Sequence, residues 1–312
     1  MGSAATEDAR MSKYHRHLIR RYRVKPGSRV RLADHDPADL GGLELIRAGA
    51  GTPKERAVEL LQLSQAELAR AQELLWASDT HSVLVVLQGM DAAGKDGTIK
   101  HVMAGVSPQG CEVHSYQAPT EPELDHTFLW RYWKDVPERG RIGLFNRSYY
   151  EEVLIVRVHP EILAAQRLPT GSRGKRFWAE RYEDINAFER HLVRNGTVIL
   201  KFFLNLSKDE QRRRLLERLE VRDKYWKFAA SDLKERGYWD EYTAAHEAML
   251  RATSTAWAPW HVIPADHKYV ARASVAAILS GTIRQLGLKF PRVTAADERR
   301  LGAARRRLVA GE

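Results

Sequence analysis

The sequence predicts an α/β protein in which helices cover both faces of a parallel sheet. Short apolar segments rich in β-branched residues alternate with longer segments of helical periodicity, and this order is typical of parallel strands joined by helices. A glycine-containing turn also joins the first apolar segment to a helix at Gly89–Lys95. The chain has 312 residues, of which 44% are hydrophobic, so it can form a substantial core.

Five segments have the length and composition of buried strands. Each is short, apolar and bounded by turn or helix signals. They are Ser82–Gln88, Glu112–Tyr116, Arg141–Phe145, Thr197–Leu204 and His261–Ile263.

The first predicted helix has a clear start. Thr52 is an N-cap residue, Pro53 suits the first helical position and Glu55 completes a capping box, so we expect a helix from there to about Trp76. Ser207 and Glu210 form a second capping box, and Asn195-Gly196 is a helix stop. The later helices are predicted at Lys95–Val106, Glu121–Lys134, Lys175–Arg194, Ser207–Leu219 and Val270–Leu286.

Composition divides the chain into three parts. Residues 1–50 are polar and basic, contain turn signals, and are expected to form an extension with little core of its own. Residues 51–290 carry the alternation of strands and helices, and residues 291–312 form an arginine-rich tail.

The charge favours an anionic partner. The net charge is +10, and basic residues gather in residues 13–31, residues 212–227 and the tail. The middle cluster lies between core elements, so it has the best claim to a ligand, whereas the tail is expected to be a solvated face. No apolar run is long enough for a membrane span, and one cysteine, Cys111, favours the reducing cytoplasm.

The turn after the first strand has the pattern of a P-loop. Gly89 and Gly94 are separated by four residues, and Lys95 follows at the start of a helix. Glycines let the backbone direct several N–H groups at phosphate oxygens, and the helix N-terminus adds partial positive charge. Lys95 is expected to reach over the loop to the transferred phosphate. The predicted phosphate-binding residues are Gly89, Ala92, Ala93, Gly94, Lys95, Asp96, Gly97 and Thr98.

Two positions depart from an ordinary P-loop enzyme. Asp96 stands where Ser or Thr normally holds Mg²⁺, so Asp91 inside the loop becomes the candidate carboxylate ligand. The third strand ends in Asn146 and Arg147, where an Asp usually serves magnesium. Polar residues at the carboxyl end of a parallel strand lie where ligands bind, although taken alone this segment is also an ordinary turn.

These motifs together resemble the polyphosphate kinase 2 family. The similarity extends from about Tyr22 to Phe290 and rests on the segments GMDAAGKDGT, FNRSYYEEVLIVRVHP, KFFLNLSKDEQRRRLLERL, KYWKF and DLKERGYWDEY. The resemblance implies a P-loop kinase fold: a three-layer α/β/α arrangement with a five-stranded parallel sheet and a helical lid at about residues 207–240. It also implies Mg²⁺-dependent transfer of phosphoryl groups between inorganic polyphosphate and nucleotides.

The resemblance also implies roles for single residues. The first family motif, G-x-D-x-x-G-K-x-G, contains no hydroxyl residue after the lysine and assigns Asp91 to magnesium. The second motif carries Asn146, Arg147 and Ser148. Asn146 followed by Tyr149-Tyr150-Glu151 is similar to the branch that accepts AMP, and often ADP as well.

The expected chemistry is electrostatic, because a nucleotide phosphate is already ionised near neutral pH and needs no strong base. Lys95, Asp91 and Arg147 are the predicted catalytic residues, with Asp91 and Asn146 organising Mg²⁺. Arg147 is expected to clamp phosphates, with Asn146 and Glu151 on the acceptor side. The predicted lid and polyphosphate contacts are Arg218, Arg222, Lys224 and Lys227.

The partners implied are inorganic polyphosphate, AMP, ADP and ATP, in a homo-oligomer without a membrane or nucleic-acid partner. Two alternatives share parts of the pattern. An ATP-dependent nucleotide kinase has the same loop, lid and sheet, and a nucleic-acid-binding P-loop protein would account for the charge. No RNA-recognition or helix-turn-helix signature accompanies that charge.

Overall fold

The computed structural model describes residues 2–43, 51–169, 171 and 173–311. Its five strands form one sheet in the order β2-β3-β1-β4-β5, and every neighbouring pair is parallel. This confirms the predicted fold class. The strands are β1 (Ser82–Gln88), β2 (Cys111–Ser115), β3 (Ile142–Asn146), β4 (Thr197–Asn205) and β5 (Trp260–Pro264).

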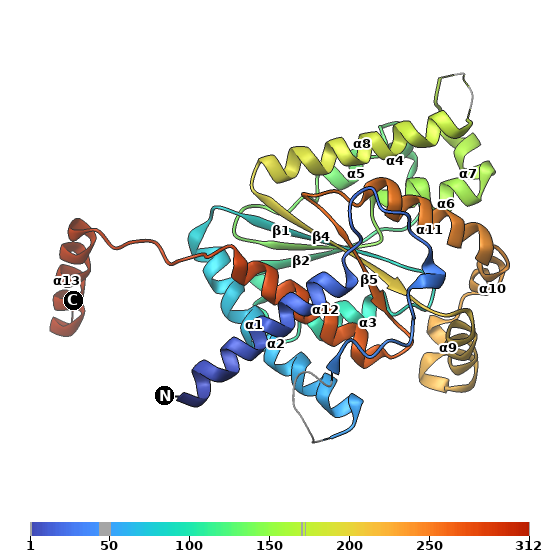
Figure 1. Cartoon of the computed structure of the whole chain (residues 1–312). Coiled ribbons are helices and arrows are strands. Elements are labelled where there is room, and N and C mark those ends of the chain that lie inside the picture. Colours follow the sequence, from blue (N-terminus) through green and yellow to red (C-terminus); the bar gives the residue numbers. More distant parts are fainter. Residues whose placement is uncertain (1, 44–50, 170, 172, 312) are drawn as a thin grey trace.

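Successive residues of β1 point to opposite faces of the sheet, and each face packs against its own set of helices. Val83, Val85 and Leu87 belong to the core formed with α1 (Gly2–Tyr22), α2 (Pro53–Ser78), α3 (Lys95–Val102) and α12 (Lys268–Gln285). Leu84 and Val86 belong to the core formed with α8 (Lys175–Arg194) and α11 (Trp239–Thr253). The result is the three-layer arrangement visible in Figure 1.

The other helices are short or lie at the rim of the sheet. They are η1 (Leu32–Asp34), η3 (Pro108–Gly110), α4 (Glu121–Leu124), α5 (Trp130–Trp133), η4 (Tyr149–Val153), α6 (Ile155–Val158), α7 (Pro160–Ala165), α9 (Lys208–Glu220), η5 (Arg222–Lys227), α10 (Ala230–Gly237) and α13 (Ala295–Ala310). In the part of the chain that the structure describes, none of the helices combines the length and the apolar character needed to cross a membrane.

The predicted helix boundaries hold where capping residues set them. Thr52 and Glu55 form the expected capping box at the start of α2, and α8 ends at Arg194 before Asn195 and Gly196. At α9 only half of the box forms. The Ser207 hydroxyl accepts from the Glu210 N–H, but the Ser207 N–H donates to Asp266 across 2.8 Å, because the Glu210 carboxylate instead pairs with two arginines.

Two local predictions are wrong. The helix expected at Glu121–Lys134 is two short helices, α4 and α5, because the chain turns between them and packs Phe128 and Leu129 against the core on the α8 side. Residues 1–50 are expected to have little core of their own, yet α1 spans most of their first half. Its residues Met11, Tyr14 and Leu18 are buried in the core that α12 shares.

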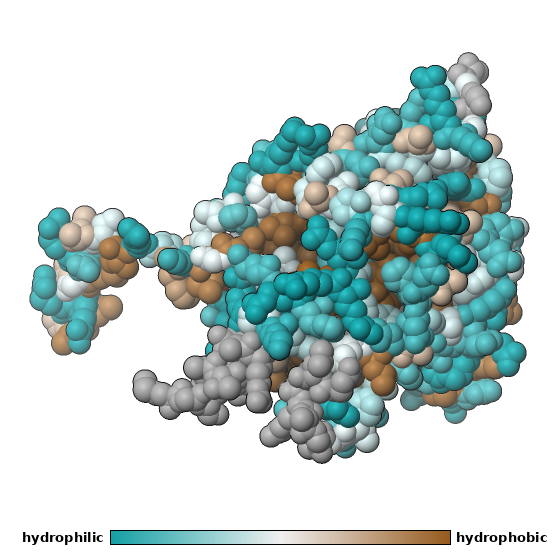
Figure 2. Space-filling model, in the orientation of Figure 1, coloured by the Kyte–Doolittle hydropathy of each residue, from teal (hydrophilic) through white to brown (hydrophobic). Residues whose placement is uncertain are grey.

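The tail contains one helix, α13, with a complete capping box at Thr294 and Asp297. None of its residues is buried, and it stands apart from the rest of the molecule at the end of an extended segment (Figure 1). Figure 2 shows both hydrophilic and hydrophobic side chains on its surface, and Leu301 and Leu308 are among the exposed apolar residues.

Candidate active site

The loop between β1 and α3 has the backbone of a phosphate cradle. Ala92 and Gly94 both have positive φ angles, of 63° and 101°, so the chain curls before α3 begins at Lys95. Only glycine fits at position 89, because a Cβ atom there would lie 2.9 Å from the carbonyl oxygen of Leu204. The loop thus brings the N-terminus of α3 to the carboxyl end of the sheet, where an anion is favoured.

Lys95 crosses the loop, as the sequence predicts. Its Nζ donates to the carbonyl oxygens of Gly89 at 2.8 Å and Met90 at 3.3 Å. Burial lowers the pKa of Lys95, and the positive charge of Arg147 lowers it further, while Asp91 and Glu151 oppose the shift. An incoming phosphate would favour the charged ammonium form and so oppose this lowering of the Lys95 pKa.

Arg147 and Asp91 form an ion pair, with 3.1 Å between Nη2 and Oδ1. Arg147 follows β3 directly and has a φ angle of 63°, an uncommon conformation for a residue with a side chain. Burial lowers the pKa of Arg147, but the carboxylates of Glu151 and Asp91 outweigh it and the pKa is raised. The guanidinium is therefore a fixed charge between the P-loop and η4.

Asn146 joins the end of β3 to α3. Its Nδ2 donates to Asp96 Oδ1 at 2.6 Å and to Ser115 Oγ at 3.4 Å. Its Oδ1 is buried and has no partner among the residues that the structure describes. Asp96, which the sequence analysis placed only among the phosphate-binding residues, is thus a second carboxylate near Asp91 on the P-loop side.

Glu151 lies on η4 behind Arg147. With the Gln88 amide in its hydrogen-bonding orientation, Gln88 Nε2 donates to Glu151 Oε1 at 3.0 Å, and Ser148 donates to the amide oxygen. Burial raises the pKa of Glu151, whereas Arg147 and Lys95 lower it. Its carboxylate therefore interacts electrostatically with Arg147 and Lys95.

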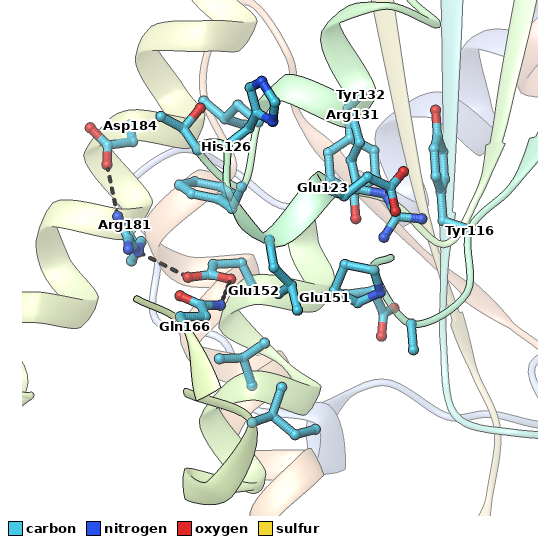
Figure 3. Close-up of a pocket in the computed structure, with 18 of the residues that line it drawn as sticks. Tyr116, Glu123, His126, Arg131, Tyr132, Glu151, Glu152, Gln166, Arg181 and Asp184 are labelled. Atoms are coloured by element: carbon cyan, nitrogen blue, oxygen red, sulfur yellow. Dashed lines mark hydrogen bonds and ion pairs between the residues drawn. The ribbon is translucent and has the colours of Figure 1, made fainter. Parts of the chain in front are cut away.

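Two cavities meet at Arg147, Glu151 and Ile155. The larger, of about 1030 Å³, lies between the 116–133 segment, η4, α6 and α8. Figure 3 shows Tyr116, Arg131 and Tyr132 along one side of it and Arg181 with Glu152 along another. The smaller, of about 210 Å³, lies between the P-loop, α10 and α11 and contains Lys95 and Asp91. A group bound in one cavity would therefore face a group bound in the other across Arg147.

The sequence of the chain matches a known family over most of this domain. The sequence model described as polyphosphate kinase 2 matches residues 52–290. The chain belongs to the polyphosphate kinase 2 family.

Curated relatives and a solved structure support the same family. An ADP-polyphosphate phosphotransferase of Rhodopseudomonas palustris is 51% identical over 89% of this chain and 97% of its own length. An AMP/ADP-polyphosphate phosphotransferase of Meiothermus ruber is 45% identical over 90% of this chain and 98% of its own. The crystal structure of polyphosphate kinase 2 from Arthrobacter aurescens TC1 has a TM-score of 0.81 at 39% identity and covers 92% of this chain and 96% of that one.

In this polyphosphate kinase 2 the basic residues predicted for the lid lie outside the described lining of the two cavities. Arg218 on α9 pairs with Asp232 of α10 at 2.7 Å, and Lys224 pairs with Glu217. Lys227 lies over the Trp226 ring at 4.9 Å, and Arg222 is exposed on η5. Arg218 therefore joins α9 to α10, whereas Arg222 and Lys227 are exposed on η5.

The sequence analysis missed several residues that line the smaller cavity. Tyr242 donates to Glu235 at 2.7 Å, and His246 bonds through Nδ1 to the Tyr242 carbonyl at 2.7 Å. Burial lowers the pKa of His246 to about 4, so its ring is neutral. The DLKERGYWDEY segment was recognised as a family motif, but its helical spacing gave no sign that Glu235, Arg236 and Tyr242 face the P-loop.

Proposed function

We propose that this polyphosphate kinase 2 transfers a phosphoryl group between inorganic polyphosphate and the nucleotides AMP and ADP. The observation that carries the proposal is the meeting of two cavities at Arg147, with the P-loop and Lys95 in one of them. Both substrates are polyanions, and in-line transfer requires them to be held end to end while their repulsion is neutralised.

The P-loop side binds the polyphosphate end. Lys95 Nζ donates to the carbonyl oxygen of Gly89 at 2.8 Å. A phosphate oxygen above the loop would replace this neutral acceptor with a charged one. The N–H groups of the loop and the N-terminus of α3 add fixed positive charge in a site shielded from water. Lys95 and Arg147 then lie on either side of the phosphoryl group in transfer.

The larger cavity receives the nucleotide. It combines aromatic side chains, Phe128 and Tyr132 among them, with the guanidinium groups of Arg131 and Arg181. Such a lining suits a base and ribose that need apolar contact and a phosphate that needs charge. Asn146, Arg147 and Glu151 form the acceptor-side group, and Arg147 clamps the nucleotide's terminal phosphate. The relatives whose names specify AMP and ADP support both acceptors.

The residues present fit a magnesium ion. In the described part of the chain no group of three or more His, Cys, Asp or Glu forms a ready-made metal site. Mg²⁺ in kinases, however, uses one or two carboxylates together with water and substrate phosphates. Asp91 and Asp96 would supply the carboxylates and the unpartnered Oδ1 of Asn146 a further oxygen. When bound, the ion would neutralise phosphate charge.

The lid and the assembly complete the proposal. Arg218, Arg222, Lys224 and Lys227 belong to a lid at about residues 207–240 that closes over the polyphosphate, with Arg222 and Lys227 as the outer contacts. Residues 1–50 are a basic N-terminal segment whose helix α1 packs into the core with α12, residues 51–290 are the kinase domain and residues 291–312 are a basic tail. We propose that the protein works in the cytoplasm as a homo-oligomer, which light scattering of the purified protein would test.

A substrate matrix tests the proposed function. The protein is mixed with Mg²⁺, with long-chain polyphosphate or ATP as donor, and with AMP, ADP or GDP as acceptor, and the products are separated. We expect ADP and ATP to form from polyphosphate with AMP and ADP. Transfer only from ATP would instead indicate an ATP-dependent nucleotide kinase, and salt-sensitive nucleic-acid binding without transfer would indicate a binding protein.

A further inference from the structure

Helix α9 satisfies three consecutive carbonyl groups of the P-loop. Gln211 Nε2 donates to the carbonyl oxygen of Asp91 at 3.0 Å. Arg214 Nη1 donates to the carbonyl oxygens of Ala92 and Ala93, each at 3.0 Å. These contacts join residues more than a hundred positions apart in the chain, and they leave the opposite side of the loop free for phosphate.

Arg214 is held in place on every side. Its side chain is 4% exposed, Nε donates to Glu210 at 2.7 Å, and Nη2 donates to the carbonyl oxygen of Asp266 at 3.1 Å. Nη2 also donates to the carbonyl oxygen of Ala265. A single guanidinium thus binds both the P-loop and the loop between β5 and α12.

The direction of these carbonyls sets the direction of the amides. The C=O and N–H of a peptide unit point in opposite directions, so carbonyls drawn towards α9 turn the N–H groups of Ala92 and Gly94 to the other side of the loop. The Ala93 N–H donates to the Met90 carbonyl oxygen at 3.1 Å and closes the turn. Ala92 adopts a φ angle of 63° to achieve this, a conformation that costs an alanine free energy. The donors of Gln211 and Arg214 stabilise that conformation in the absence of phosphate. Buried carbonyl groups without such donors would destabilise it.

Gln211 also connects the P-loop to the lid. Its Oε1 accepts from Arg236 Nη1 of α10 at 2.8 Å, and Arg236 lines the smaller cavity. The same Nη1 donates to the Lys208 carbonyl at 2.7 Å. The contacts run from α10 through Gln211 to the carbonyl of Asp91.

We infer that Gln211 and Arg214 are positioning residues that pre-set the P-loop amides for the phosphate chain. They act through the backbone of Asp91–Ala93 and do not themselves contact the reacting atoms. Helix α9 is then part of the phosphate cradle. The inference deepens the proposed function, on which its kinetic assay rests.

The experiment compares Arg214→Met, Arg214→Lys and Gln211→Met with Arg213→Met as the matched control. Arg213 is the neighbouring residue on α9 and pairs with the same Glu210. Its side chain is 60% exposed, however, and it pairs with Glu210 and Glu217, two carboxylates of its own helix. For each variant, KM for polyphosphate, KM for AMP, kcat and the melting temperature are measured. Calorimetry of tripolyphosphate binding with Mg²⁺ gives an affinity that does not depend on turnover.

We expect Arg214→Met to raise the polyphosphate KM and the tripolyphosphate Kd about tenfold or more, with the AMP KM within about twofold. Arg214→Lys should restore part of the lost affinity, and Gln211→Met should raise the Kd for tripolyphosphate a few-fold. Arg213→Met should behave as wild type. A merely structural role would lower the melting temperature without separating the two substrates.

The inference is overturned if a folded Arg214→Met binds tripolyphosphate like the wild type, or if both substrates weaken equally. If Arg214→Met fails to fold, the test rests on Gln211→Met and Arg214→Lys. Unchanged tripolyphosphate binding in both of these variants would then overturn the inference. If the wild type itself transfers nothing from polyphosphate, the proposed function is wrong, and the calorimetric comparison still tests the positioning.

Discussion

The side-chain amide of Asn146 donates to Asp96 across 2.6 Å and so joins the end of β3 to the first turn of α3. This contact puts a neutral donor where P-loop enzymes commonly carry a second carboxylate. Asn146 directly precedes Arg147, which lines both cavities, although neither Asn146 nor Asp96 is itself among the described lining residues. We therefore expect the identity of residue 146 to affect both the charge and the geometry on the proposed acceptor side.

Asn146→Asp is expected to change the ratio of AMP to ADP phosphorylation by at least several-fold, or about 1 kcal/mol of differential transition-state binding. The new carboxylate would face Asp96 without a hydrogen bond, so a cation becomes necessary to hold the pair. The added carboxylate would also bind Mg²⁺ more tightly, so the Mg²⁺ concentration for half-maximal activity should fall. The measurement is kcat/KM for AMP and ADP at saturating polyphosphate over a range of Mg²⁺ concentrations.

The chain offers a matched control for that variant. Combining Asn146→Asp with Asp96→Asn restores an amide and a carboxylate in reversed order, so the Mg²⁺ requirement should return towards that of the wild type. An unchanged AMP-to-ADP ratio in Asn146→Asp would leave this residue as a turn residue without a part in acceptor choice.

Lys95→Met is expected to lower kcat/KM about a hundredfold, because a preorganised charge at the phosphate is worth on the order of 3 kcal/mol. The fold should survive, since the Nζ contacts are to Gly89 and Met90 carbonyls at the open side of the loop. Lys100→Met on the same helix is the control, because Lys100 is exposed. Activity within a few-fold of wild type in a folded Lys95→Met would contradict the assignment of the loop.

The lid arginines and lysines should fall into two classes. Arg218 joins α9 to α10 through Asp232, so Arg218→Ala should weaken polyphosphate and nucleotide together by disturbing the closed lid. Arg222→Ala with Lys227→Ala should raise the KM for long polyphosphate more than that for AMP. Added salt should mimic the second effect, because exposed charges are screened beyond about 8–10 Å. Kinetics with both substrates at two ionic strengths distinguish the classes, and equal effects of all variants would argue against a polyphosphate track.

Acid should destabilise the protein through buried histidines. Burial lowers the pKa of His246 and of His261 from 6.5 to about 4. Between these values the unfolded chain binds protons that the folded chain does not, so stability is complete above about pH 6.5 and is lost as the pH falls towards about 4. Each histidine contributes a loss of about 2 kcal/mol at about pH 5 relative to neutral pH.

His261→Leu isolates one of these contributions, since His261 lies outside the described lining of both cavities. Urea unfolding at about pH 7 and at about pH 5 should show a smaller acid loss for the variant, by about 2 kcal/mol. If wild type and variant lose the same free energy of unfolding, His261 is not neutral in the folded protein.

The strands and the P-loop were predictable because their signals are local. β1 and the loop to Lys95 depend on neighbouring residues, and the capping box at Thr52 acts within one turn. Helices α4 and α5 were predicted as one because their apolar residues fit a helical period. The helix is interrupted because Phe128 and Leu129 pack against the core, and the neighbouring sequence does not reveal such packing.

The charged residues of the candidate site were predictable from the sequence, but the residues that position the P-loop were not. Lys95, Asp91 and Arg147 come together because they end adjacent strands, a relation that follows from the order of a parallel sheet. Arg214 and Gln211 reach the P-loop from α9 more than a hundred residues later, and their helical pattern is that of a solvated face. The basic composition of residues 212–227 predicted a ligand contact, whereas Arg214 binds the protein's own backbone.

The separated position of α13 has a practical consequence for biocatalysis. No residue of this helix is buried, and an extended segment connects it to α12, so neither the core nor the two cavities depend on it. Residues 291–312 can therefore be exchanged for a surface anchor or for a second enzyme that consumes ATP. Such a fusion would renew its nucleotide at the point of use, and the cargo would be attached beyond α12 and not at the lid.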